Sequence, residues 1–395
     1  MSDQYAGGPG VTAPLGFRAA GVAAGLKGGS ARDVAVVAND GPHRSAAAVT
    51  TSNRVKAAPV TWTDQVVGHG RLKAVVLNSG GANACTGAAG RADVVTTATY
   101  AAELLGCTPD EVAVCSTGLI GVRLPMNLLT VGVRSACERL SAGGGPDAAA
   151  AILTTDTVTK TAVTGVGGVR IGAMAKGAGM LAPSLATMLV VITTDAVVAP
   201  ASLDAALRAA TEVTFDRIDS DGCQSTNDTV LAMASGASGV MVGRDLPEPD
   251  FAGALVTVCS SLAGQLLADA EGASKQIDIR VSKARTEADA VDVARSVARS
   301  NLFKCAMHGE DPNWGRVLAA VGTSSATFDP DALAVWMNGT LVCRGGAALD
   351  KEPVVDLTGE RIVVHIELAA GAAEATVWTN DLTAAYVHEN SAYSS

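Results

Sequence analysis

The sequence predicts a mixed α+β fold with a larger layered core and a smaller α+β domain at the C-terminal end. In roughly the first 275 residues, short β-rich runs end in polar, glycine-containing loops, and apolar residues recur at helical spacing between these runs. After that point the pattern changes to apolar–polar alternation, which is typical of half-exposed antiparallel strands. Because Gly, Ala and Val dominate the composition, we expect the sheets and helices to pack closely.

The N-terminal part contains two candidate site loops. Residues 1 to about 30 are rich in glycine and alanine and are expected to lead loosely into the first strand. A strand predicted at 71–77 ends in the polar loop 78–83, and a strand at 112–115 runs into Ser116-Thr117-Gly118. A polar glycine loop at a strand end is a typical place for a functional site.

The middle of the chain is expected to alternate helices and strands. Apolar residues at i, i+4, i+8 and i+11 predict a helix from Leu129 to Leu140, ended by the glycines that follow. A second helix is predicted to begin near Ser202, a favourable N-cap residue, and a third to cover 250–270. β-rich runs predict strands at 160–165, 169–174, 187–193 and 229–232.

The last third of the chain is expected to form an α+β layer. Residues 276–281 alternate apolar and polar side chains, and a helix is predicted from 287 to about 302. The Asn338-Gly339 dipeptide between two β-rich runs predicts a hairpin. A second hairpin is predicted to join 361–368 with 373–378. The polar tail 389–395 would be expected, on its composition, to fray.

Charge and composition exclude several classes of function. The 29 Lys or Arg and 39 Asp or Glu residues give a formal charge of −10 with no basic run, which excludes a dedicated nucleic-acid binder and favours a small-molecule partner. No apolar stretch approaches the roughly 20 residues of a membrane helix, and the N-terminus does not resemble a secretory signal. Eight scattered cysteines predict reduced thiols in a cytoplasmic protein. The five histidines lack metal-ligand spacing, so no metal site is expected.

The least ordinary stretch is 176–189, a Gly/Pro loop that runs directly into the β-branched strand and brings Thr187 to its start. A threonine hydroxyl is a weak nucleophile unless an adjacent base takes its proton. One solution is a threonine at a new chain N-terminus, because its own α-amino group has an ordinary pKa of about 7.7 to 8.0. On pattern alone, a glycine loop before a buried strand is the simpler interpretation.

The same stretch closely resembles the self-cleaving site of the ornithine acetyltransferase (glutamate N-acetyltransferase) family, which runs an acetyl shuttle in arginine biosynthesis. Further matching motifs follow in the family's order over nearly the whole chain. These are 78–84 (NSGGANA), 115–121 (CSTGLIG), 154–156 (TTD), 225–229 (STNDT), 269–272 (DAEG), 311–316 (DPNWGR) and 389–393 (ENSAY).

This resemblance implies a self-processing, N-terminal-nucleophile-like sandwich of sheets and helices. The precursor would cut itself between Ala186 and Thr187, so that 1–186 becomes one chain of the catalytic core. Residues 187–275 would complete the core, and 276–395 would form the C-terminal domain, whose tail returns to the active site. The two chains are expected to assemble as an α2β2 heterotetramer.

The resemblance also implies the chemistry. Thr187 would take the acetyl group from N2-acetyl-L-ornithine and pass it to L-glutamate in a ping-pong cycle, with an oxyanion hole at Thr117 and Gly118. No cofactor is implied, and whether acetyl-CoA is a second acetyl donor is left open. The implied substrate contacts are Thr154, Lys176, Thr187, Glu271, Asn390 and Ser395.

Two other functions also fit the sequence. An aminopeptidase or amidase of the same self-processing fold would differ only in letting water attack the acyl-enzyme. An uncleaved binding or scaffold protein of this fold would carry out no chemistry. Taken singly, Lys176 and Glu271 are also typical of solvated surface charges, Thr117 of a turn hydroxyl, and Asn390 of an exposed tail.

Overall fold

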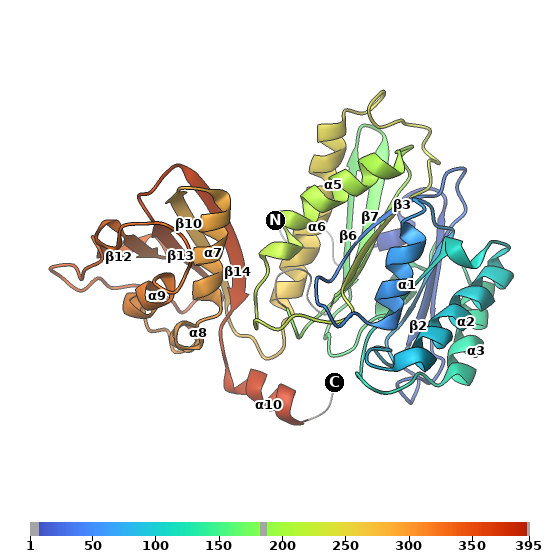
Figure 1. The fold of residues 1–395 in the computed structure, drawn as a ribbon, viewed down its shortest axis with the longest axis horizontal. Coiled ribbons are helices and arrows are strands. Elements are labelled where there is room, and N and C mark those ends of the chain that lie inside the picture. The colour runs from blue at the N-terminus through green and yellow to red at the C-terminus, as the bar shows by residue number, and fades with distance from the viewer. Residues whose placement is uncertain (1–7, 182–187, 393–395) are drawn as a thin grey trace.

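Two β-sheets packed face to face form the centre of the larger of two structural units (Figure 1). The structure, a computed structural model, describes residues 8–181 and 188–392. The first sheet has the strand order β1 (Phe17–Val22), β2 (Val34–Asn39), β4 (Ala74–Asn78) and β5 (Val112–Ser116). The second sheet has the order β3 (Ser45–Thr50), β9 (Thr229–Ala234), β8 (Leu189–Thr194), β7 (Val169–Lys176) and β6 (Lys160–Val166).

Small and β-branched side chains fill the space between the two sheets. Every residue of β2, β4, β5, β8 and β9 is buried, because both faces of these strands are covered. Val37 and Val75 of the first sheet pack in one cluster with Met174, Val191 and Leu231 of the second. This interior explains why the composition is so rich in alanine and valine.

Helices cover the outer face of each sheet, so the larger unit has four layers (Figure 1). Helices α2 (Gly87–Leu105) and α3 (Met126–Glu138) pack on the first sheet, and α5 (Pro200–Glu212) and α6 (Glu248–Ala268) on the second. Helices α1 (Ala58–Val67) and α4 (Gly145–Ala151) pack beside β5 and β1. Short 3-10 turns lie at Gly10–Thr12, Pro109–Glu111, Phe215–Arg217 and Pro330–Ala332.

Among the described residues, α6 is one helix whose length and hydropathy would suffice to cross a membrane. Half of that stretch is buried, and its apolar side chains, including Phe251, Leu255 and Leu262, pack in the cluster on the second sheet. The expectation that no apolar stretch approaches membrane-spanning length is therefore wrong for α6, which nevertheless has the surroundings of a core helix.

The C-terminal unit contains a five-stranded sheet with helices on one face. Its strand order is β12 (Thr340–Arg344), β11 (Ala334–Met337), β13 (Arg361–Glu367), β10 (Gln276–Ala284) and β14 (Ala373–Asn380). Helices α7 (Glu287–Ala298), α8 (Asn301–His308) and α9 (Trp314–Val321) pack against it. Helix α10 (Ala384–Ala392) leaves this unit and extends toward the larger one (Figure 1).

The mixed α+β architecture with a smaller C-terminal unit confirms the predicted fold class. The Asn338-Gly339 hairpin is also confirmed: both residues have positive φ, 47° and 82°, as its tight turn requires.

Four local predictions were wrong. Strand β1 lies within the segment expected to be loose, and Gly21 in it packs so closely on α4 that a Cβ would clash with the Asp147 carbonyl. The helix predicted over 287–302 is two helices, because the Ser300 side chain caps α8 by accepting from Phe303 N–H. Helix α5 begins at Pro200, near Ser202 as expected, but its N-cap residue is Ala199 and not Ser202.

The fourth error concerns the pairing of β13 and β14. They form no hairpin, because β10 lies between them, parallel to β13 and antiparallel to β14. A pattern in the sequence shows that strands exist, but a strand that comes nearly a hundred residues earlier decides which neighbours they have.

Candidate active site

The loops that meet at one end of the two central sheets enclose a cavity of about 440 Å³. Strands β4 and β5 run parallel and end there, β7 ends there, and the segment before β9 arrives there. Asn227 connects two of these loops, since its Nδ2 donates to the carbonyls of Ala82 at 2.6 Å and Ser116 at 2.8 Å. Six of the predicted site residues line the cavity: Thr117, Gly118, Thr154, Lys176, Glu271 and Asn390.

Three further predicted residues lie outside the described residues. They are Ala186, Thr187 and Ser395. The described chain resumes at Met188, whose backbone N–H donates to Asp228 Oδ1 at 3.1 Å just before β8 begins.

The turn after β5 offers an unused hydroxyl to the cavity. Thr117 is 1% exposed, and its Oγ1 has no hydrogen-bond partner among the described residues. Its backbone N–H is already bound to the Asn78 carbonyl at 3.0 Å, so the donors that this turn can offer a ligand are the Thr117 hydroxyl and the Gly118 N–H. Gly118 has φ +124°, and a Cβ there would lie 2.8 Å from Gly81 N, which explains the glycine.

Lys176 is a buried cation at the end of β7, not a solvated loop charge. Its side chain is 2% exposed, and Nζ donates to Thr154 Oγ1 at 2.6 Å and lies 3.5 Å from Asp156 Oδ2. Asp156 Oδ1 also accepts from Lys160 Nζ at 2.8 Å, and Lys160 in turn contacts Asp269. Burial alone would raise the pKa of Asp156, but the positive charges of Lys176 and Lys160 outweigh it and hold that pKa well below its ordinary value.

Glu271 presents its carboxylate to the cavity beside the glycine loop. Its backbone N–H donates to the Ala178 carbonyl at 2.9 Å. A Cβ on Gly179 would lie 2.6 Å from Glu271 Oε2, so the carboxylate packs directly on that glycine. Asn390 of α10 donates to Glu271 Oε2 at 3.0 Å, and this contact brings the C-terminal helix to the site.

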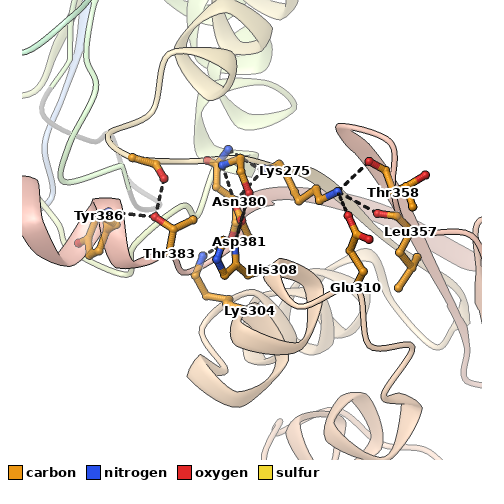
Figure 2. Close-up of polar contacts among 12 residues, drawn as sticks. Lys275, Lys304, His308, Glu310, Leu357, Thr358, Asn380, Asp381, Thr383 and Tyr386 are labelled. Atoms are coloured by element: carbon orange, nitrogen blue, oxygen red, sulfur yellow. Dashed lines mark hydrogen bonds and ion pairs between the residues drawn. The ribbon is translucent and has the colours of Figure 1, made fainter.

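Helix α10 is held in place by contacts with the chain just after Glu271 (Figure 2). Thr383 Oγ1 donates to the Gly272 carbonyl at 2.6 Å and accepts from Tyr386 N–H at 2.9 Å. Gly272 has φ +60°, and a Cβ there would clash with Tyr386 N. The helix start therefore packs on the backbone of Gly272, which requires a residue without a side chain.

A second group of contacts fixes the segment that precedes α10 (Figure 2). Asp381 accepts from the backbone N–H groups of Ser274 at 2.9 Å and Lys275 at 2.8 Å, and it contacts His308 Nδ1 at 2.9 Å. Lys275 Nζ donates to Glu310 and to the Leu357 carbonyl, both at 2.9 Å. These two groups of hydrogen bonds fix the chain on both sides of the contact between Glu271 and Asn390.

Two ionisable residues at the site were not predicted as functional. Asp228 lies inside the 225–229 motif; burial raises its pKa well above the ordinary value, and the Met188 N–H only partly offsets this. Lys27 lines the cavity from the segment expected to be loose, and its Nζ donates to the Leu153 carbonyl at 2.7 Å. The Gly-rich surroundings of Lys27 gave no pattern from which its position could be predicted. No group of three His, Cys, Asp or Glu side chains suited to a metal occurs within 8–181 and 188–392.

Comparison with known proteins agrees with the resemblance seen in the sequence. The family model described as "ArgJ family" matches residues 18–395. The chain belongs to the ArgJ family. It is 62% identical to the arginine biosynthesis bifunctional protein ArgJ of Thermobifida fusca, over 97% of this chain and 99% of that protein. It is 60% identical to the protein of the same name from Streptomyces coelicolor, over 98% of this chain and 100% of that one.

Parts of this ArgJ-family chain are also similar to solved structures. Ornithine acetyltransferase from Mycobacterium tuberculosis, solved in complex with ornithine, is 53% identical, with a TM-score of 0.41, and the match covers 45% of this chain and 96% of that one. ArgJ from Bacillus halodurans is 31% identical, with a TM-score of 0.47, over 51% and 97% of the two chains. An aminopeptidase/amidase from Ochrobactrum anthropi is 16% identical, with a TM-score of 0.43 over 69% and 89%.

Proposed function

We propose that this chain is a glutamate N-acetyltransferase of arginine biosynthesis, which moves the acetyl group of N2-acetyl-L-ornithine to L-glutamate. The observation that carries the proposal is the cavity itself. It combines the buried ammonium of Lys176, the carboxylate of Glu271 and the Thr117 hydroxyl, which has no partner within the described part of the chain. The strand that follows Thr187 begins beside it. Family membership and identities near 60% over whole chains support the same function.

In this proposal the nucleophile is made by self-cleavage between Ala186 and Thr187. The Thr187 hydroxyl attacks the acetyl carbonyl of acetylornithine, and its proton passes to the new α-amino group of Thr187. The oxyanion that forms accepts hydrogen bonds from Thr117 and Gly118. When the C–N bond breaks, the ornithine amine takes the proton and leaves, and Thr187 carries an acetyl ester. The α-amine of glutamate then attacks the ester and restores the hydroxyl.

The charged side chains of the cavity bind the two ends of the donor. Lys176 pairs with the α-carboxylate of the donor. Thr154 and Asp156 hold the Lys176 ammonium in position. Glu271, oriented by Asn390, accepts the side-chain ammonium of ornithine. An amino-acid derivative with opposite charges at its two ends fits this arrangement.

The proposal also covers the second acetyl donor, the cofactor, the location and the assembly. The relatives are named bifunctional, which supports acetyl-CoA as a second acetyl donor at the same nucleophile. We propose no cofactor, a cytoplasmic location, and an α2β2 heterotetramer of the two chains produced by cleavage.

Intact-mass analysis tests the proposal and separates it from its two alternatives. Purified protein is expected to give two chains, 1–186 and 187–395, and the second should gain one acetyl group when acetylornithine is added. Glutamate should then remove that group and yield acetylglutamate. Acetate release at the same rate without glutamate would instead indicate an amidase, and a single uncut, unacetylated chain would indicate a protein without this chemistry.

A further inference from the structure

The proposed reaction makes one cavity accept two substrates whose side chains have opposite charges. Acetylornithine and glutamate share an α-carboxylate and an α-nitrogen, but the ornithine side chain ends in an ammonium and the glutamate side chain in a carboxylate. Glu271 suits the first and repels the second. A cation elsewhere on the cavity wall is therefore needed for glutamate, and Lys176 is already assigned to the α-carboxylate that both substrates share.

Lys27 is held at the cavity wall by its loop. Asp33 accepts from the backbone N–H groups of Ala24 and Leu26, both at 2.6 Å, and so closes the loop between β1 and β2. The loop presses on the one after β4, since a Cβ on Gly80 would clash with Leu26. The Lys27 ammonium is anchored by the carbonyl that precedes Thr154, the residue that holds Lys176.

The charge of Lys27 is less neutralised than that of Lys176. Within the described parts of the chain its Nζ forms no ion pair with a carboxylate, whereas Lys176 lies 3.5 Å from Asp156. Lys27 is an exposed residue, but partial burial at the cavity wall still lowers its pKa; the charge of Asp33 opposes this shift, and the nearby charge of Lys176 lowers the pKa further. An anion arriving in the cavity would offset both unfavourable effects, because its negative charge favours the charged form of this ammonium.

We propose that Lys27 Nζ binds the side-chain carboxylate of glutamate, so that it determines acceptor specificity while Glu271 determines donor specificity. This inference rests on the proposed function and assigns a residue to its second half-reaction. Each substrate then reaches a side chain of opposite charge from the same α-carboxylate and α-nitrogen positions.

The test compares glutamate with glutamine as acceptors in wild type and Lys27→Met. Glutamine keeps the size of glutamate and lacks the negative charge. A charge-assisted contact of this kind is expected to be worth about ten- to a hundredfold. Lys27→Met should therefore lower kcat/KM for glutamate by that factor and leave kcat/KM for glutamine unchanged. Acetylation by acetylornithine should stay as fast or become faster, because a positive charge near its ammonium has been removed.

Controls separate binding from a structural role. Lys27→Arg should recover most of the preference for glutamate, and Lys351→Met, at an exposed position outside the cavity, should behave as wild type. An equal loss with both acceptors, or unchanged glutamate kinetics, would overturn the assignment of Lys27. If wild type itself is not acetylated by acetylornithine, the proposed function fails instead, so the two failures are distinguishable.

Discussion

Single side chains around the cavity differ in whether their polar atoms already have partners. Lys176 is bound by Thr154 and Asp156 before any substrate arrives, so it is preorganised as a fixed positive charge. The Thr117 hydroxyl is buried without a partner among residues 8–181 and 188–392, and an unpaired buried hydroxyl costs free energy in the folded protein. A ligand atom that accepts a hydrogen bond from the Thr117 hydroxyl removes that cost. This suits a donor to an oxyanion, because the oxyanion forms only during the reaction.

Thr117→Val should therefore separate catalysis from stability. The change keeps the shape of the side chain and removes an unsatisfied hydroxyl, so kcat should fall about a hundred- to a thousandfold while the thermal midpoint stays equal or rises. Kinetics of acetylornithine cleavage and a melting curve measure both.

Thr63→Val is the matched control for Thr117→Val. Thr63 is equally buried, but its hydroxyl donates to the Val114 carbonyl at 2.7 Å. Loss of this hydrogen bond should lower the free energy of unfolding by about 1 kcal/mol and leave kcat unchanged. If Thr117→Val destabilised the protein as much as Thr63→Val and kept full activity, Thr117 would be a structural residue.

At the scale of elements, the sequence predicts the strands and helices whose own residues show a hydrophobic pattern. Strands β5, β7 and β9 and helices α3 and α6 follow from runs and spacings that the core requires. Strand β1 was missed because half of its six residues are Ala or Gly, which carry little strand signal. Helix α10 was missed because it has no buried face: contacts with Gly272 and Thr383 hold it in place.

The candidate site was predicted from the family resemblance and not from local patterns in the sequence. Residue types and spacing gave only loops at strand ends, and the roles of Lys176, Glu271 and Asn390 came from the family resemblance. The structure brings these three to one cavity although they are far apart in the chain. Lys27 was missed because its position depends on Asp33 and on close packing at Gly80, neither of which leaves a periodic pattern.

Gly272→Ala tests whether α10 serves the site. The new Cβ would clash with Tyr386 N, so the helix start must shift and Asn390 should lose its contact with Glu271. The kcat/KM for acetylornithine should fall about ten- to a hundredfold, with small change in the melting of the core. Gly339→Ala has the same positive-φ strain, φ +82°, with nothing within 4 Å of its Cβ, and should keep full activity. Equal activity in the two variants would remove α10 from the site.

At the scale of the whole molecule, a buried lysine connects the two units. Lys304 of α8, which lies beside Asn380 in Figure 2, donates to the Asn380 carbonyl and to Thr379 Oγ1 at 3.0 Å. It also donates to the Ser220 carbonyl at 2.5 Å, and so ties β14 to a loop of the larger unit. Burial lowers the pKa of Lys304 to about 8, although the charges of Asp221 and Asp219 oppose the shift.

This pKa predicts an unusual dependence of stability on pH. The folded protein releases the Lys304 proton near pH 8, whereas the unfolded chain keeps it until about pH 10.4, so the unfolded state binds more protons in between. Stability from this group should rise as the pH increases from 8 toward 10.4. The free energy of unfolding of wild type minus that of Lys304→Met should grow by about 1 to 2 kcal/mol between pH 7 and 9.5. A difference that stays flat, measured by urea titration at each pH, would contradict the lowered pKa.

The strand order of the second sheet has a consequence for refolding after self-cleavage. Strands β8 and β9, which follow residue 187, lie between β3 on one side and β7 and β6 on the other, all of which precede it. The proposed cut therefore leaves the native sheet in place but removes the covalent connection between strands that are neighbours in it. That connection is no longer present when the cut protein has to refold. Denatured wild type should recover its circular dichroism slowly, with a yield that depends on protein concentration. Uncut Thr187→Ala should recover in a concentration-independent reaction, and equal, concentration-independent recovery of both would show that the connection is dispensable. The mature enzyme would then persist in its native form because it unfolds slowly, since its refolding is slow and requires two chains to meet.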